Sequence, residues 1–246
     1  MKKINLFCHL SIIFSFLFCS VSSAQNVNNV FQYSVLSALR SGNFEGDLSI
    51  RELINHGNFG LGTFNGMDGE LILLNGEIYR ASEKGEISSV SGDSFTPYAI
   101  VTNFKPDDSI NIPNPYSTAE LNKFLDSKLD TNFIYAVKIE GTFTYLKTRS
   151  IPLQLKPYKK MTEVLKTQPV FESENIKGTM VGYRFPAYIN RVNQPGYHFH
   201  FITIEKNSGG HVLDLKTGNV KIEFARQNSL QISFPKNKYL MGLSPN

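Results

Sequence analysis

Cysteine is nearly absent from this 246-residue sequence, which has only Cys8 and Cys19. Both lie in an N-terminal stretch that we expect to be removed, so the mature chain would have no thiol. That excludes a disulfide framework, a thiolate nucleophile and a thiolate metal ligand. An exported chain without disulfides depends on its hydrophobic core, and the 222 residues from 25 to 246 suffice for one large domain or two small ones.

The expected leader, a signal peptide, is residues 1–24. Two lysines open it, an apolar run follows, and the small residues Ser22 and Ala24 precede the cleavage site. The apolar run is shorter than the ~20 residues that a membrane-spanning helix needs. We therefore predict a protein exported to the periplasm or the medium, with no stable membrane span. A lipoprotein cut before Cys19 is the alternative, and a phenylalanine directly before that cysteine disfavours it.

An excess of charge of one sign is also missing. Loss of Lys2 and Lys3 with the leader lowers the formal net charge from +4 to +2. The sequence has no basic run interleaved with aromatic residues, no heptad repeat and no internal duplication. These absences argue against nucleic acid or an anionic membrane as the partner.

Helical and strand patterns are both present, and strands prevail toward the C-terminus. Apolar spacing, capping signals and glycine stops predict helices at 31–42, 49–57, 117–129 and 159–168. Asn-Gly and Lys-Gly signals predict hairpins within residues 70–90. The prediction is an α+β, β-rich fold. A mixed β-sheet with a few helices occupies residues 25–165, and a mainly antiparallel, β-barrel-like part follows in residues 166–246, unless the two share one core.

Histidine is scarce as well, yet three of the five histidines are His198, His200 and His211. Residues two apart in a strand share a face, so the first two project side by side. A hairpin centred near 206–207 would place His211 opposite about residue 202, within reach of both. Three neutral imidazoles suit zinc with one position left open, and cobalt, nickel, manganese or iron also fit. His56 is interpreted as a helix C-cap and not as a ligand.

Such a site does not name its reaction, because it can hydrolyse, decarboxylate, oxygenate or merely store a metal. Four blocks narrow the choice, since they occur together and in order. They are "HGNFGLGTFNGMDGELILLNGEIY" (56–79), "TPYAIVTNFKPD" (96–107), "KTRSIPLQLKPY" (147–158) and "GYHFHF" with "GGHVLDL" (196–215). Together they resemble the acetolactate decarboxylase family over roughly residues 30–226.

The resemblance implies a zinc enzyme that converts 2-acetolactate to acetoin and carbon dioxide, and it implies a homodimer. It also implies that the three histidines hold the metal and that Glu70, Arg149 and Thr63 are active-site residues. The chemistry is reasonable, because loss of carbon dioxide leaves an electron pair that the neighbouring ketone delocalises as an enediolate. A metal chelated by the ketone and hydroxyl oxygens of the substrate would stabilise that charge. No organic cofactor is then required.

Two positions depart from the family pattern. Relatives commonly carry a glutamate in a longer C-terminal tail, whereas the only acids after His211 here are Asp214 and Glu223. The glutamate of the tail is absent, is replaced by another residue, or belongs to a C-terminal segment that this sequence lacks. The proton donor is therefore not identified. Leu153 stands where a basic residue is frequent. The alternatives to the decarboxylase are an exported three-histidine metal-binding module without catalysis, and a metal hydrolase or oxygenase acting on another substrate.

Overall fold

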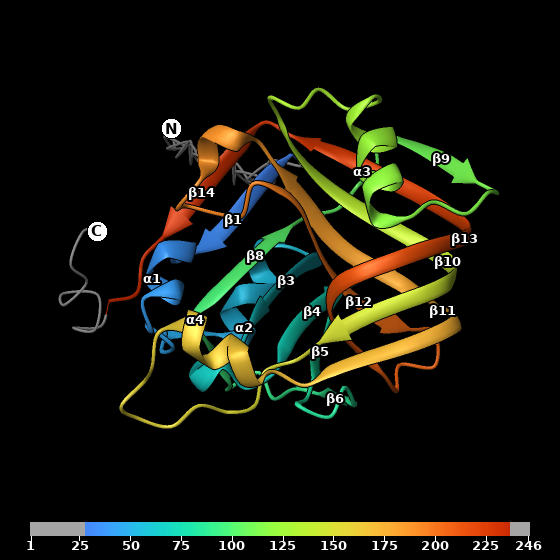
Figure 1. The fold of residues 1–246 in the computed structure, drawn as a ribbon. Helices are drawn as coiled ribbons and strands as arrows, with labels where there is room; N and C mark the ends of the chain where they lie inside the picture. The colour runs from blue at the N-terminus through green and yellow to red at the C-terminus, as the bar shows by residue number, and fades with distance from the viewer. Residues whose placement is uncertain (1–27, 237–246) are drawn as a thin grey trace, which may run out of the picture.

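Two sheets facing each other make up the fold in the computed structural model, which describes residues 28–236 (Figure 1). The expected leader and the last ten residues lie outside this range. The first sheet is mixed, because β1 and β14 are parallel and its other neighbours are antiparallel. Its order is β14 (Ser229–Ser233), β1 (Asn29–Tyr33), β8 (Tyr98–Thr102), β3 (Phe59–Thr63), β4 (Glu70–Leu74), β5 (Glu77–Ala81) and β6 (Ile87–Ser89).

The second sheet is antiparallel and closes on itself. Its strands are β10 (Ile134–Arg149), β11 (Val170–Phe185), β12 (Gly196–Thr203) and β13 (Gly209–Gln227), with β9 (Asp108–Ile112) added outside β13. β10 pairs with both β11 and β13, and this second pairing closes the ring of four strands. The predicted fold class, a mixed sheet combined with an antiparallel, barrel-like part, is confirmed.

The helices are short, and three begin or end where local signals indicated. α2 (Ile50–Leu53), continued by η1 (Ile54–His56), and α3 (Thr118–Asp126) each start with a complete capping box. α4 (Met161–Val164) and η3 (Leu165–Thr167) match the predicted helix at 159–168. Two 3-10 turns, η2 (Asn65–Met67) and η4 (Ala187–Ile189), and a two-stranded ribbon of β2 (Leu48–Ser49) with β7 (Phe95–Thr96) complete the described elements.

The prediction of a helix at 31–42 is wrong for the first half of that range. Residues 29–33 form β1 in the interior of the mixed sheet, and only α1 (Leu36–Arg40) is helical. Phe31 and Tyr33 pack on one face of the sheet and Val30 on the other, so the apolar residues satisfy a strand period. Ser34 then takes a positive φ of 64°, which separates strand from helix.

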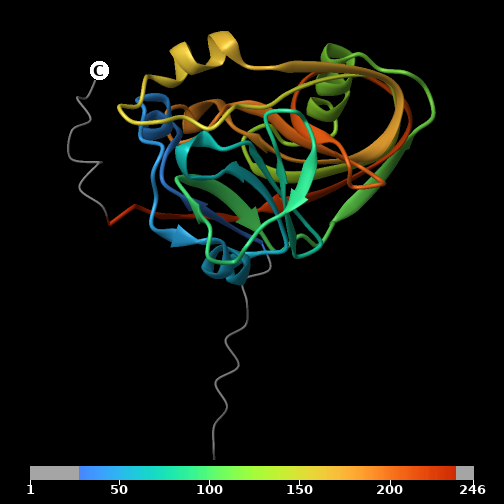
Figure 2. The same ribbon diagram turned by 90° about the horizontal axis from the view of Figure 1, so that it is seen from below.

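The two sheets share one core. A cluster of buried apolar residues between them draws on both, for example Leu61, Ile72 and Ile100 from the mixed sheet and Ala136, Val181 and Ile202 from the barrel. A second cluster fills the barrel. A third lies on the far face of the mixed sheet, the face that α2 covers (Figure 2). The predicted boundary at 165/166 does not separate the sheets, because β9 and β10 precede it and β14 follows it. Within residues 28–236, no helix has the length and apolar character to cross a bilayer.

Candidate active site

One row of the site lies on the mixed sheet, at the end of three neighbouring strands. Thr63 on β3 pairs in register with Glu70 on β4 and, on its other side, with Tyr98 on β8. Residues directly opposite each other across antiparallel strands project from the same face. Tyr98 belongs to the core between the sheets, so all three side chains face the barrel.

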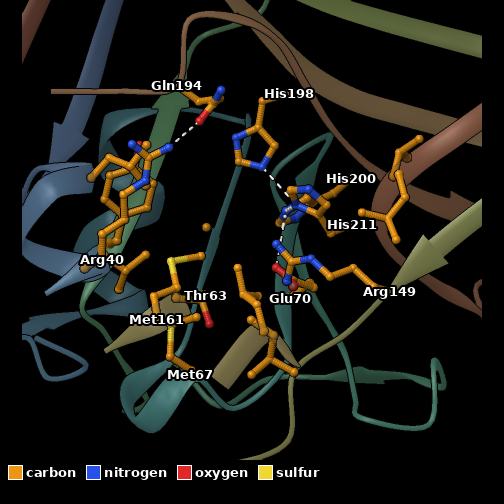
Figure 3. Close-up of a pocket in the computed structure, with 18 of the residues that line it drawn as sticks. Arg40, Thr63, Met67, Glu70, Arg149, Met161, Gln194, His198, His200 and His211 are labelled. Carbon is orange, nitrogen blue, oxygen red and sulfur yellow. Dashed lines mark hydrogen bonds and ion pairs between the residues drawn. The ribbon is translucent and has the colours of Figure 1, made fainter. Parts of the chain in front are cut away.

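A second row lies on the barrel and faces the first. Arg149 on β10 pairs in register with His211 on β13, which pairs in turn with His200 on β12. His198 lies two residues from His200 on the same face of β12. Figure 3 shows the three imidazoles together, with Arg149 reaching Glu70 beside them.

The hairpin between β12 and β13 has a different register from the predicted one. His211 lies opposite His200, and not opposite residue 202, because the turn is centred one residue earlier. The Thr203 hydroxyl donates to the Asn207 carboxamide and accepts from the backbone N–H of Asn207 and of Ser208, which closes a four-residue loop. A shift of two residues preserves the face of a strand, so the three histidines still converge.

Glycine is required where this strand enters the site. Gly210 has a φ of 156°, and a Cβ there would lie 2.6 Å from the backbone oxygen of Arg149. The close approach of β13 to β10 therefore depends on the missing side chain. This crowding fixes His211 directly beside Arg149.

The three histidines present nitrogens at ligand spacing. The Nε2 of His198 is 3.1 Å from the Nδ1 of His211, which is 3.3 Å from the Nε2 of His200. Two ligands at ~2.0–2.1 Å from a tetrahedral zinc are separated by about 3.3 Å, so these two spacings fit. The ligand atoms of all three histidines lie within 4.8 Å of one another. Octahedral ions at slightly longer distances fit nearly as well. Within the described residues these three are the group of side chains able to hold a metal.

Electrostatics keep these imidazoles neutral. Burial holds the pKa of His198 and of His211 well below the ordinary value, and nearby positive charge adds to the effect. Burial likewise lowers the pKa of His200 to about 3. The Nδ1 of His200 donates to the backbone oxygen of Leu71 at 2.8 Å, so its Nε2 carries the lone pair that faces the cluster. A neutral ring with an oriented lone pair is the form that binds a cation.

Glu70 and Arg149 form a buried ion pair beside the histidines. The Nη1 of Arg149 donates to Oε1 of Glu70 at 2.5 Å, and the other carboxylate oxygen lies 3.3 Å from the Nε2 of His200. Burial raises the pKa of Glu70, and the charge of Arg149 opposes that rise. The carboxyl can therefore exchange a proton closer to neutral pH than an exposed glutamate can.

Local contacts hold this pair in place. Gly69 has a φ of 79°, and a Cβ there would lie 2.3 Å from the backbone oxygen of Ala81, so the turn before Glu70 requires glycine. Ser150 donates to the same oxygen at 2.9 Å, which ties the end of β10 to β5. The Thr63 hydroxyl donates to the backbone oxygen of Gly69 at 2.7 Å and therefore presents an acceptor toward the site.

These residues line one cavity of about 430 Å³ between the two sheets. All six residues proposed from the sequence are in its wall: Thr63, Glu70, Arg149, His198, His200 and His211. The sequence analysis missed other parts of the wall, which come from α1, β8, α4, η3 and the segment before β12: Leu36, Leu39, Arg40, Tyr98, Met161, Leu165 and Gln194. No local motif marks them, because they belong to the cavity only through packing.

Other residues discussed in the sequence analysis lie outside the cavity wall. His56 ends η1 and stacks on Phe31 with ring centroids 3.7 Å apart. Asp214 accepts a hydrogen bond from Thr118, and Glu223 pairs with lysines. Leu153 is 54% exposed and is not in the cavity wall. The tail in which relatives carry a glutamate falls outside the described residues.

Comparison with known proteins identifies the family. A family model described as alpha-acetolactate decarboxylase matches residues 30–243. The alpha-acetolactate decarboxylase of Brevibacillus brevis is 41% identical, over 85% of this chain and 73% of its own length. That of Methanosarcina mazei is 44% identical, over 78% of this chain and 68% of its own. The crystal structure of the Bacillus subtilis strain 168 enzyme superposes with a TM-score of 0.86 at 35% identity, covering 88% of this chain and 93% of that one. The chain belongs to the alpha-acetolactate decarboxylase family and is a decarboxylase.

Proposed function

We propose that this enzyme converts 2-acetolactate to acetoin and carbon dioxide at a zinc ion held by His198, His200 and His211. The observation that supports it most directly is the convergence of three neutral imidazoles beside a buried Glu70–Arg149 pair, in a cavity that admits a small molecule. When bound, the cation supplies Lewis acidity, which lowers the energy of negative charge developing on a substrate oxygen.

Arg149 orients the substrate carboxylate. One of its N–H groups is engaged by Glu70, and the guanidinium has further N–H donors in a planar arrangement that matches a carboxylate. These donors bind the carboxylate next to the histidines. The bond from the carboxylate carbon to its neighbour breaks there, and the electron pair passes to the adjacent ketone.

The carbon that loses the carboxylate must then receive one proton. Glu70 is placed to supply or accept it, because its carboxyl is buried, has a raised pKa and touches both Arg149 and His200. Thr63 presents its hydroxyl oxygen as an acceptor for the substrate hydroxyl, since its own proton is committed to the Gly69 carbonyl. Protonation from one face would set the configuration of acetoin.

The test is acetoin formation from racemic acetolactate by the purified protein, with and without a chelator, together with metal analysis. The proposal expects zinc in the active protein and chelator-sensitive turnover that zinc restores. Arg149→Ala should keep the metal and lose turnover. A folded, zinc-loaded protein that makes no acetoin would refute the proposal, and loss of metal in Arg149→Ala would refute the role of that residue.

Export is a separate proposal. It is supported by the leader pattern in residues 1–24, and an exported enzyme would convert acetolactate that has left the cytoplasm into neutral acetoin. Mass spectrometry of the protein from cell fractions tests it. A chain starting at Gln25 outside the cytoplasm supports export, and a full-length cytoplasmic chain refutes it.

We also propose a homodimer, as the family resemblance implies. Large apolar side chains such as Leu153, Leu155 and Tyr188 are more than half exposed, which is consistent with a covered surface. Light scattering of the purified protein would give the mass of the assembly. A monomer at all concentrations used for activity would refute this proposal.

A further inference from the structure

The charges that line the cavity do not cancel. Charged side chains in its wall are Arg40, Glu70 and Arg149. Arg149 and Glu70 neutralise each other at 2.5 Å. Among the described residues Arg40 forms no ion pair, and its side-chain partner is a neutral amide, so its positive charge in the cavity wall is uncompensated.

Arg40 lies across the cavity from His200 and His211, and Gln194, which it reaches, lies beside His198 (Figure 3). Arg40 is the last residue of α1, and its Nη2 donates to the Oε1 of Gln194 at 2.5 Å. This partner is a neutral amide, so the contact orients the guanidinium without removing its charge. Both residues are exposed, which makes the guanidinium accessible to a molecule entering the cavity.

Tyr98 adds a second polar group to this part of the wall. It continues the row of Glu70 and Thr63 across the mixed sheet and lines the same cavity. The residue is only 3% exposed, and its hydroxyl has no hydrogen-bond partner within the described residues. A buried hydroxyl without a hydrogen-bond partner destabilises the folded protein, because it has lost its contact with water. Such a group in the wall of a ligand cavity is expected to bond to the ligand.

We infer that Arg40, oriented by Gln194 and assisted by the Tyr98 hydroxyl, is the first binding site for the carboxylate of the incoming substrate, which then passes to Arg149 beside the histidines. The inference depends on the proposed function, because it takes an anionic 2-hydroxy-3-keto acid as the substrate. The anion meets Arg40 first, and Arg149 orients it at the reacting end. Acetoin is neutral and forms no ion pair with Arg40, so the same charge that attracts the substrate does not retain the product.

The first experiment measures KM and kcat for acetolactate in Arg40→Gln. An accessible ion pair is worth up to about 1 kcal/mol, which corresponds to about a fivefold rise in KM, with kcat nearly unchanged. Arg40→Lys should keep most of the wild-type KM, since it keeps the charge. Added salt should raise the KM of the wild type more than that of Arg40→Gln.

The matched control is Arg51→Gln, which makes the same change in net charge on the surface far from the cavity wall. Arg51 is exposed and pairs with Asp93. The KM of Arg51→Gln for acetolactate should equal that of the wild type. If Arg40→Gln also has the wild-type KM, the inference is wrong. If both variants shift KM equally, the effect comes from net charge and not from a site, and the inference is also wrong.

Tyr98→Phe separates binding from folding. The change removes a hydroxyl without a partner, so the free energy of unfolding should stay equal or rise, while KM rises. An unchanged KM would exclude Tyr98 from carboxylate binding. Loss of stability would show that the hydroxyl has a structural partner instead.

Inhibitors distinguish this inference from the proposed function. The anion 2-hydroxy-2-methylpropanoate should bind about fivefold more weakly to Arg40→Gln than to the wild type, whereas neutral acetoin should bind both equally. Calorimetry can measure the anion's binding even in a protein that makes no acetoin. If Arg40→Gln binds the anion and acetoin more weakly by the same factor, the substitution has changed the shape of the cavity, and the inference is wrong. Absence of acetoin formation by the wild type would refute the proposed function alone.

Discussion

Arg149 and Glu70 meet in a buried ion pair whose two partners lie on different sheets, one at the end of β10 and the other at the start of β4. The contact therefore ties the barrel to the mixed sheet at the edge of the cavity. Removing one member of such a pair destabilises the protein strongly, because the other charge is then buried without a partner.

Glu70→Ala should consequently destabilise the protein as well as inactivate it. The free energy of unfolding should fall by about 3 kcal/mol, because Arg149 loses its acceptor. Glu70→Gln keeps an acceptor oxygen and should lose less stability, yet turnover in both variants should fall by about 100-fold or more. Urea unfolding and acetoin assays measure the two effects. Wild-type turnover in Glu70→Gln would show that the charge and proton of Glu70 are not needed.

His200 has two functions that substitution can separate. Its Nδ1 donates to Leu71 and its Nε2 faces the other histidines. His200→Asn can keep the first contact but not the second, so it should lose metal and activity with little loss of stability. His200→Ala should lose both, with a further loss of about 1 kcal/mol. Metal analysis and urea unfolding of the two variants provide the comparison, and metal retained in His200→Asn would exclude His200 as a ligand.

Gly210 and Gly76 form a matched pair for testing the crowding at the site. Both have positive φ, 156° and 83°, but a Cβ at Gly76 would meet nothing within 4 Å. Gly76→Ala should therefore cost about 1 kcal/mol of backbone strain and leave activity intact. Gly210→Ala should cost about 3 kcal/mol and weaken metal binding, because β13 must move away from the Arg149 carbonyl. Thermal and urea unfolding measure the loss of stability in each variant. An equal loss in Gly76→Ala and Gly210→Ala would contradict this explanation.

His56 offers a test of pH dependence away from the site. Burial lowers its pKa below the ordinary value of 6.5, so the folded state binds the proton less well than the unfolded state. Its contribution to stability is present above the unfolded pKa and is lost as the pH falls through the folded pKa. His56→Phe keeps an aromatic ring on Phe31 and cannot titrate. The stability of the wild type relative to this variant should fall between pH 7.5 and 5; a constant difference would show that the pKa is not lowered.

Local sequence determined those features that depend on a few neighbouring residues. Ser49 with Glu52, and Ser117 with Glu120, were sufficient to place two helix starts, because a capping box is completed within four residues. Asn75 and Gly76 both take positive φ in the turn between β4 and β5, a conformation that Asn and Gly adopt at little steric cost. The period of two along β12 placed His198 and His200 on one face. The convergence of these two histidines, which could hold a metal, was predictable for this reason.

Only the tertiary structure decided which distant residues each strand and helix contacts. Residues 31–33 are compatible with either a helix or a strand, and burial between β14 and β8 selects the strand. The register of His211 depends on where the Thr203 loop closes. Glu70 and Arg149 are 79 residues apart, and no local pattern relates them. Arg40, Tyr98 and Gln194 become a wall of the cavity through the packing of the sheets and α1, since long-range contacts follow from the burial of whole surfaces and not from the spacing of residues along one segment.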